Sequence, residues 1–194
     1  MRKLILINAL FLLSCTSQPV ANNASNLFDL PKFHYRIIDN LIEKHSPVDK
    51  LFILNDVSEQ RSINKTDSIF WLDELSVLLT TDLNSPRYRG QIIADVGLKD
   101  SVSNLLINRY RTVNSSLSLK ELDVYYLTDL SGIRIIKLKL ESKNFISSSQ
   151  QEVTAWFNHY SGKLLLDSIV TLGKETVVFQ NERSYESHIQ RVRK

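Results

Sequence analysis

The chain contains a single cysteine, Cys15, among its 194 residues. The rest of the chain can therefore form no internal disulfide and no thiolate metal site. Glycine is also scarce, with five residues, which disfavours a glycine-rich loop that cradles phosphate. No nucleophile-elbow, zinc-protease, Walker or dinucleotide-binding motif occurs in the sequence. These absences predict a protein that is not an enzyme and that needs no cofactor.

Histidine offers no better metal site, because the four histidines are dispersed along the chain. His34 and His45 are the only two that fall within one predicted helix. They lie on nearly the same side of it, but they are 11 positions apart. That separation is about 16 Å along a helix, which one ion cannot bridge. We therefore predict no metal site.

The apparent basicity of the chain comes mostly from its first residues. The whole chain has 24 basic and 21 acidic residues, and Arg2 and Lys3 precede an apolar run over residues 4–13. This order is typical of a secretory signal, and the run is shorter than the roughly 20 apolar residues that span a bilayer. Without residues 1–14 the net charge falls to +1. No nucleic-acid partner is predicted from so balanced a charge.

The end of this signal, Leu12-Leu13-Ser14-Cys15, resembles the lipobox of bacterial lipoproteins. The resemblance implies that residues 1–14 are a lipoprotein signal peptide and that acyl chains such as palmitate are attached to Cys15. Those chains would hold the protein on a lipid bilayer. Residues 15–26 are small and polar, and we interpret them as a flexible tether. The alternative is a core cysteine that follows an ordinary cleavable signal.

The residues after the cysteine bear on the destination of such a lipoprotein. Thr16 stands where an Asp retains enterobacterial lipoproteins in the inner membrane, and no acidic run follows it. Surface-exported lipoproteins of Bacteroidetes carry such an acidic run. We therefore expect the periplasmic face of the outer membrane, where an envelope protein is a candidate partner.

Residues 27–194 are predicted to form one α+β domain. Two amphipathic helices are expected at 29–45 and 66–83, with a short hairpin over residues 51–63 between them. From residue 88 onward apolar and polar residues alternate, and glycine-containing turns divide the runs. This pattern predicts an antiparallel sheet with one buried face. We predict two N-terminal helices packed on a meander of six to eight strands, either open or curled toward a half barrel.

Short motifs of this domain are similar to those of a group of Bacteroidetes lipoproteins. The motifs are Phe28-Asp29-Leu30, the helix segment Trp71-Leu72-Asp73-Glu74-Leu75 and the helix exit Asp82-Leu83-Asn84-Ser85-Pro86. The resemblance implies an envelope lipoprotein in which helices precede a β-rich half. It implies no activity, because none is assigned to that group.

Three residues on the second helix and at its exit are candidate ligand contacts, namely Trp71, Arg87 and Tyr88. The alternative is that Trp71 fills the core, while Arg87 and Tyr88 hold the helix exit against the sheet. Asp73 and Glu74 could likewise offer carboxylates to a cleft, or could form the solvated face of the helix.

The sequence supports three hypotheses about function. The first is a non-catalytic interaction or assembly module, anchored to the envelope through acylated Cys15. The second is a carrier or sensor of an apolar ligand held between the helices and the sheet. The third is a hydrolase whose site is assembled from distant residues. No sequence motif supports this third hypothesis.

Overall fold

The computed structural model describes residues 27–192. The predicted signal peptide, Cys15 and the tether lie outside the described residues. Helix α1 covers Leu30–Lys44, and the Asp29 side chain caps its start by accepting a hydrogen bond from the Lys32 backbone N–H at 2.8 Å. It ends at His45, which adopts the left-handed conformation. The helix predicted over residues 29–45 is confirmed.

A hairpin and two short helices follow α1. The hairpin strands are β1, Val48–Leu54, and β2, Val57–Ile63, and the turn residues between them, Asn55 and Asp56, both have positive φ. The single helix predicted over residues 66–83 is wrong in its extent. It consists of α2, Ser68–Glu74, and α3, Ser76–Leu79, divided at Leu75. No proline or glycine marks the division, which is why the apolar periodicity did not reveal it.

The helix exit is a short 3₁₀ helix, η1, over Pro86–Tyr88. Seven further strands follow, with a second 3₁₀ helix, η2 (Leu130–Gly132), after the third of them. They are β3 Ile92–Lys99, β4 Leu106–Thr112, β5 Leu119–Tyr126, β6 Ile133–Lys143, β7 Ser147–Tyr160, β8 Lys163–Val177 and β9 Arg183–Arg191.

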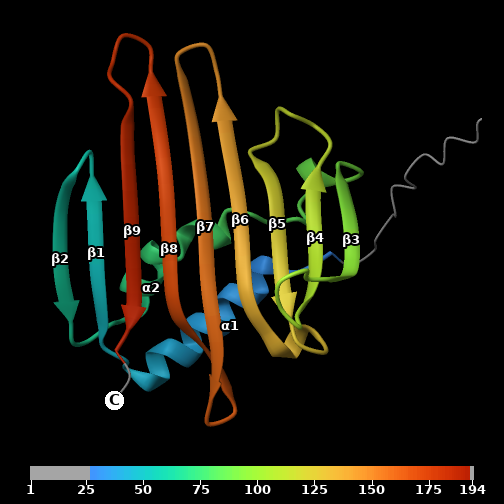
Figure 1. Cartoon of the computed structure of the whole chain (residues 1–194), viewed down its shortest axis with the longest axis vertical. Coiled ribbons are helices and arrows are strands. Elements are labelled where there is room, and N and C mark those ends of the chain that lie inside the picture. Colours follow the sequence, from blue (N-terminus) through green and yellow to red (C-terminus); the bar gives the residue numbers. More distant parts are fainter. Residues whose placement is uncertain (1–26, 193–194) are drawn as a thin grey trace, which may run out of the picture.

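All the strands belong to one antiparallel sheet with the order β2-β1-β9-β8-β7-β6-β5-β4-β3 (Figure 1). The sheet has nine strands, more than the six to eight predicted, because the β1–β2 hairpin pairs with β9 and extends the meander. Its edges, β2 and β3, are far apart in the sheet order and are not paired with each other. The sheet is therefore open and does not close into a barrel.

The helices cover one face of this sheet, which we call the inner face, and leave the outer face bare (Figure 1). The core lies between the helices and the inner face. Phe33 of α1 meets Phe157 of β7 edge to face, with ring centroids 5.2 Å apart. Inward-facing residues of the central strands, such as Leu122, Ile136 and Ala155, are fully buried.

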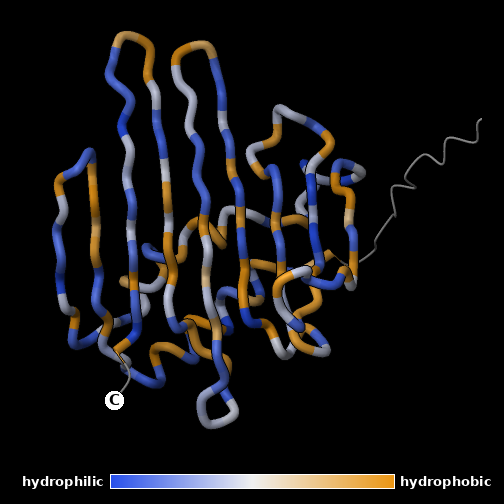
Figure 2. Tube along the Cα trace, in the orientation of Figure 1, coloured by the Kyte–Doolittle hydropathy of each residue, from blue (hydrophilic) through white to orange (hydrophobic). Residues whose placement is uncertain are grey.

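The central strands are longer than the helix layer. One half of β7 is apolar and buried at Val153, Ala155 and Phe157. The other half, residues 147–152, reads Ser-Ser-Ser-Gln-Gln-Glu and is exposed or half-buried. Strands β6 to β9 therefore extend past the helices as an uncovered, largely polar sheet that ends in two apolar turns (Figure 2).

Candidate functional site

The ligand contacts proposed from sequence are part of the framework of the domain. Trp71 and Tyr88 are each only 1% exposed and belong to the core. Arg87 lies over the Tyr88 ring, with its guanidinium carbon 4.7 Å from the ring centroid, and one of its N–H groups donates to the Thr80 carbonyl at 3.0 Å. These contacts fix the exit of α3 against the core. They do not bring Trp71, Arg87 and Tyr88 together around an open pocket.

The helix carboxylates have a similar structural role. Glu74 at the end of α2 forms an ion pair with Lys50 of β1, on the inner face. The pair ties the short helix to the hairpin that extends the sheet. Among the residues that the structure describes, no group of three His, Cys, Asp or Glu side chains is arranged to hold a metal ion.

A buried polar cluster surrounds Asp167, the extra residue of a β-bulge in β8. Its carboxylate accepts hydrogen bonds from Arg191 at 2.9 Å, from the Tyr160 hydroxyl at 2.8 Å and from the Asn158 amide at 2.6 Å. The side chains of Asp167 and Arg191 are each 9% exposed. Because the carboxylate has many partners and little solvent, we interpret the cluster as a structural clamp on the bulge.

The outer face is not covered by the helices, and it is less polar than strand alternation predicts. Trp156 of β7 and Leu172 of β8 point outward and are 37% and 43% exposed. Cross-strand register places Trp156 beside Ile135 of β6, and Ile135 beside Tyr125 of β5. Tyr125 is only 8% exposed, and the Lys137 ammonium lies 5.1 Å from its ring centroid. Adjacent residues of this kind interact directly across a sheet, so they form a continuous apolar row.

Charged pairs border this row on the outer face. Arg109 of β4 donates two hydrogen bonds to the Asp123 carboxylate, at 2.8 and 2.6 Å, and these bonds raise the pKa of the arginine. Lys139 of β6 pairs with Glu152 of β7 at 3.0 Å, which raises the pKa of the lysine. The outer face thus combines apolar contact area with fixed polar groups, as interaction surfaces do.

A groove of about 440 Å³ opens on the outer face, across β1, β9, β8, β7 and β6. Ile53 and Leu172 contribute apolar surface to it. Its charged lining consists of Lys139, Lys174, Asp56, Glu141, Glu152 and Glu186. Acidic groups outnumber the lysines there, and Lys174 is itself paired with Glu182 at 3.5 Å. The groove therefore suits a partner that brings positive charge together with some apolar surface.

A second open pocket, of about 640 Å³, lies between the start of α1 and strands β3 and β4. Phe28, Phe33 and Val96 give it apolar walls. Its charged lining residues are Lys32 and Arg36 of α1 and Asp29, whose carboxylate caps the helix. At its back the Tyr126 hydroxyl donates to the Asn108 side chain at 2.9 Å. The combination of apolar walls and two cations fits an amphiphile with an anionic head.

The sequence did not point to either pocket. The groove depends on pairing between strands that are distant in sequence, and the second pocket depends on the packing of α1 against β3 and β4. The alternating pattern only predicts that outward residues are solvated. The one available signal for the outer face was Trp156 at an outward position of β7, because an exposed tryptophan is uncommon unless it makes a contact, but Trp156 lines neither pocket. Neither pocket is lined by a residue of α2 or α3.

No protein-family model, no curated protein and no solved structure matches this chain. Within residues 27–192, no helix is long and apolar enough to cross a membrane. The functional argument therefore depends on the surfaces described above and on the predicted anchor.

Proposed function

We propose that this protein is a lipid-anchored envelope protein that works as a non-catalytic interaction module. Acylated Cys15 is the proposed anchor, and residues 15–26 are the proposed tether between the bilayer and the domain. The lipobox resemblance supports the anchor. The proposed location is the periplasmic face of the outer membrane.

The single observation that carries the interaction role is the bare outer face. An exposed tryptophan and an exposed leucine lie there, on the face of the sheet that the helices do not cover. Exposed apolar rows bordered by fixed charges are typical of protein-binding surfaces. The proposed partner is an envelope protein that presents basic and apolar side chains to the groove.

The anchor is tested by metabolic labelling of the full chain with palmitate. Labelling of the parent chain and its loss in Cys15→Ala would support the proposal. Equal labelling of both chains, or none of either, would refute acylation at Cys15. Protease treatment of intact cells then tests the leaflet, since a domain on the periplasmic face is protected until the outer membrane is opened.

Partner binding is tested with a photo-crosslinking amino acid placed at Leu172 on the outer face. The matched control is Tyr35, which is 55% exposed on α1, on the other side of the sheet. We expect a discrete envelope-protein adduct from position 172 and none from position 35. The same adduct from both positions, or none from position 172, would contradict the proposed surface.

The pocket at the start of α1 favours a second candidate function, that of a carrier or sensor of an apolar ligand. Its position between helix and sheet, its apolar walls and its two cations support this role. Native mass spectrometry of the chain extracted from membranes should then find an acidic lipid bound. Val96→Trp, which fills the pocket from its exposed side, should release that lipid. Retention of the lipid in the variant would exclude this pocket as the lipid-binding site.

A further inference from the structure

The turns that join β6 to β7 and β8 to β9 form one apolar tip, which we define as Phe145, Ile146, Val178 and Phe179. The two turns lie side by side, because the Val178 backbone N–H donates to the Ile146 carbonyl at 2.8 Å. Phe145 is 91% exposed and Phe179 is 103% exposed, so neither ring is covered by the domain. Figure 2 shows both turns as apolar ends of strand segments that are largely polar.

Folding does not account for these side chains. Phe179 has a φ of 66°, in the left-handed region, which is unfavourable for a residue with a β-carbon and which turns usually assign to glycine or asparagine. Its ring gains no packing in return, since it is fully exposed. A phenylalanine in a strained and solvated turn position therefore indicates a contact outside the domain.

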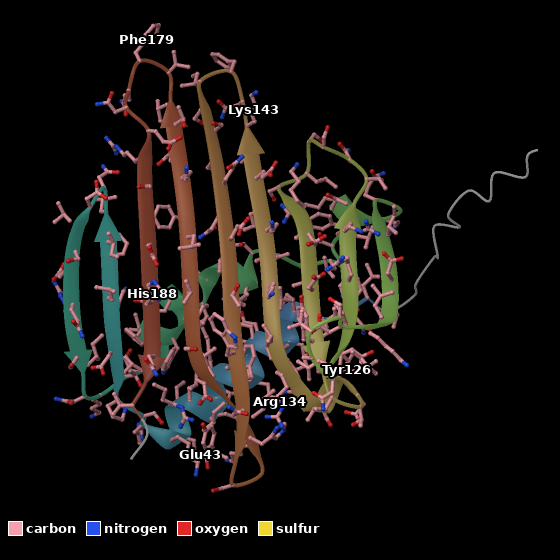
Figure 3. The ribbon with its side chains drawn as sticks, in the orientation of Figure 1. Glu43, Tyr126, Arg134, Lys143, Phe179 and His188 are labelled. Atoms are coloured by element: carbon pink, nitrogen blue, oxygen red, sulfur yellow. The ribbon has the colours of Figure 1, made fainter. Side chains whose placement is uncertain are left out.

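The tip lies at one end of the molecule, beyond the helices, so it can contact an external surface while the rest of the domain does not. Strands β6 to β9 extend past the helices, and Phe179 points away from the end of the sheet (Figure 3). Residues 143–147 and 177–181 include one charged side chain, Lys143. The end of the molecule thus presents aromatic rings and a lysine, a combination that suits the boundary between acyl chains and phosphate headgroups.

The size and shape of the tip favour a lipid surface over a protein. Two phenylalanines and two half-exposed aliphatic side chains offer about 500 Å² of contact area. A stable protein interface uses about 800 Å² on each side. The tip is also convex, so it can enter a fluid bilayer without a matching cavity. Under the proposed function the domain stays near a bilayer, because the chain from the acylated Cys15 to Leu27 spans at most about 40 Å.

We propose that the tip inserts into the interface of the bilayer and is a second membrane contact, separate from the acyl anchor. With the tip inserted, strands β6 to β9 stand upright on the membrane. The outer face is then held at a fixed orientation and stays accessible from the side. This inference rests on the proposed anchoring only for its source of membrane, and the experiment below separates the two.

The test uses the full acylated chain in vesicles of phosphatidylethanolamine and phosphatidylglycerol that carry brominated acyl chains. Phe179→Trp places a fluorophore at the tip. The matched control is Val102→Trp, since Val102 is 92% exposed in the β3–β4 loop at the opposite end of the sheet. The signal of the parent chain, which contains Trp71 and Trp156, is subtracted from both.

We expect the emission of the tip tryptophan to shift to shorter wavelength and to be quenched, most strongly by bromines near the headgroups, since interfacial side chains bury about 5–10 Å. The control should show neither change. A chain that fails to float with the vesicles refutes the anchor. A chain that floats without quenching at position 179 refutes the tip. Tip-to-tip dimers detected by sedimentation, without quenching, would assign the tip to a second copy and also overturn the proposal.

Discussion

The strands of this sheet differ in character where helices cover them and where they do not. The covered half of β7 buries Val153, Ala155 and Phe157 against the core, whereas its uncovered half consists of serine, glutamine and glutamate. Burial of apolar surface stabilises the first half. The second half depends on backbone hydrogen bonds and cross-strand pairs, which contribute less per residue. One strand can therefore be part of a core at one end and a projecting support at the other.

The inner and outer faces of the sheet differ in the same way, and the difference is visible between neighbouring residues of one strand. Ile135 and Ile136 are consecutive in β6, but Ile136 is fully buried beneath the helices and Ile135 lies in the outer apolar row. The same residue type, isoleucine, thus belongs to the core on the inner face and to the proposed interaction surface on the outer face. Substitutions in matched pairs can test how sharp this division is.

The largest effect is expected at the covered margin of the sheet, in the ion pair of Asp167. Asp167→Ala leaves Arg191 buried without its carboxylate, and we expect a loss of about 3–5 kcal/mol in the free energy of unfolding. Glu152→Ala, which removes the exposed pair with Lys139 on the outer face, should cost below about 1 kcal/mol. Urea unfolding followed by tryptophan fluorescence measures both. Equal losses of unfolding free energy in the two variants would show that the buried pair of Asp167 and the exposed pair of Glu152 contribute alike to stability.

The isoleucine pair should show the next largest difference. Ile136→Ala opens a cavity in the core and should lower the free energy of unfolding by about 2–5 kcal/mol. Ile135→Ala should lower it by about 0.5 kcal/mol, because its side chain is half-exposed. The same urea titration compares the two variants. If Ile135→Ala lowers the free energy of unfolding as much as Ile136→Ala does, the outer face contributes to folding like the core and is not a surface reserved for binding.

His34 makes the covered side sensitive to pH. It is fully buried on α1, neither ring nitrogen has a hydrogen-bond partner, and burial lowers its pKa from 6.5 to about 4. The unfolded chain then takes up a proton between pH 6.5 and 4 that the folded chain does not. Stability should be complete above pH 6.5 and should fall toward pH 4, by about 3 kcal/mol in all.

The control for His34 is His34→Leu, which removes the titrating group and fills similar space with apolar atoms. Its unfolding free energy should depend less on pH between 6.5 and 4 than that of the parent chain, and at neutral pH it should equal or exceed the parent value. A parallel decline of the two chains across this window would show that other groups carry the acid sensitivity.

Apart from the matched controls Glu152→Ala and Ile135→Ala, the smallest effect is expected where the inner face is uncovered, at Gly173 of β8. A β-carbon there would lie 2.0 Å from the ring of Tyr185, its direct partner on β9. The ring covers the glycine as aromatic residues do in designed sheets. Gly173→Ala should cost about 1–3 kcal/mol through this overlap.

The rescue experiment for Gly173 combines it with Tyr185→Ala. The double variant should lose less stability than the two single variants added together, because the smaller side chain removes the clash. Thermal unfolding of the four chains gives the coupling energy. Strict additivity would mean that the ring moves aside freely and does not stabilise the uncovered strands.

Much of the architecture could be predicted from local patterns. Asp29, Pro31 and the apolar spacing of residues 30–41 predicted α1, and the alternating runs after residue 88 predicted the antiparallel sheet. The division of the second helix at Leu75 could not be predicted, since no breaker residue marks it. The residue before the division, Glu74, forms an ion pair with Lys50 of a strand 24 positions earlier, a contact that local patterns do not contain.

The candidate surfaces were far less predictable. The groove on the outer face is built from residues of five strands, and its existence depends on β1 pairing with β9, more than 130 positions later. Sequence pattern alone left Leu172 as one more alternating apolar residue. Likewise, Phe145 and Phe179 are 34 positions apart in the chain, and only the pairing of β7 with β8 brings their turns together.

The sequence by itself determined the local features of this protein: the helix caps, the two-residue period of the strands, the turns and the lipobox resemblance at Cys15. These follow from interactions between residues close together in the chain. Only the tertiary structure decided which face of the sheet the helices cover, how far the strands extend past them and which exposed apolar residues meet. Those outcomes depend on contacts between distant segments, whose free energy is gained only when the whole sheet has formed.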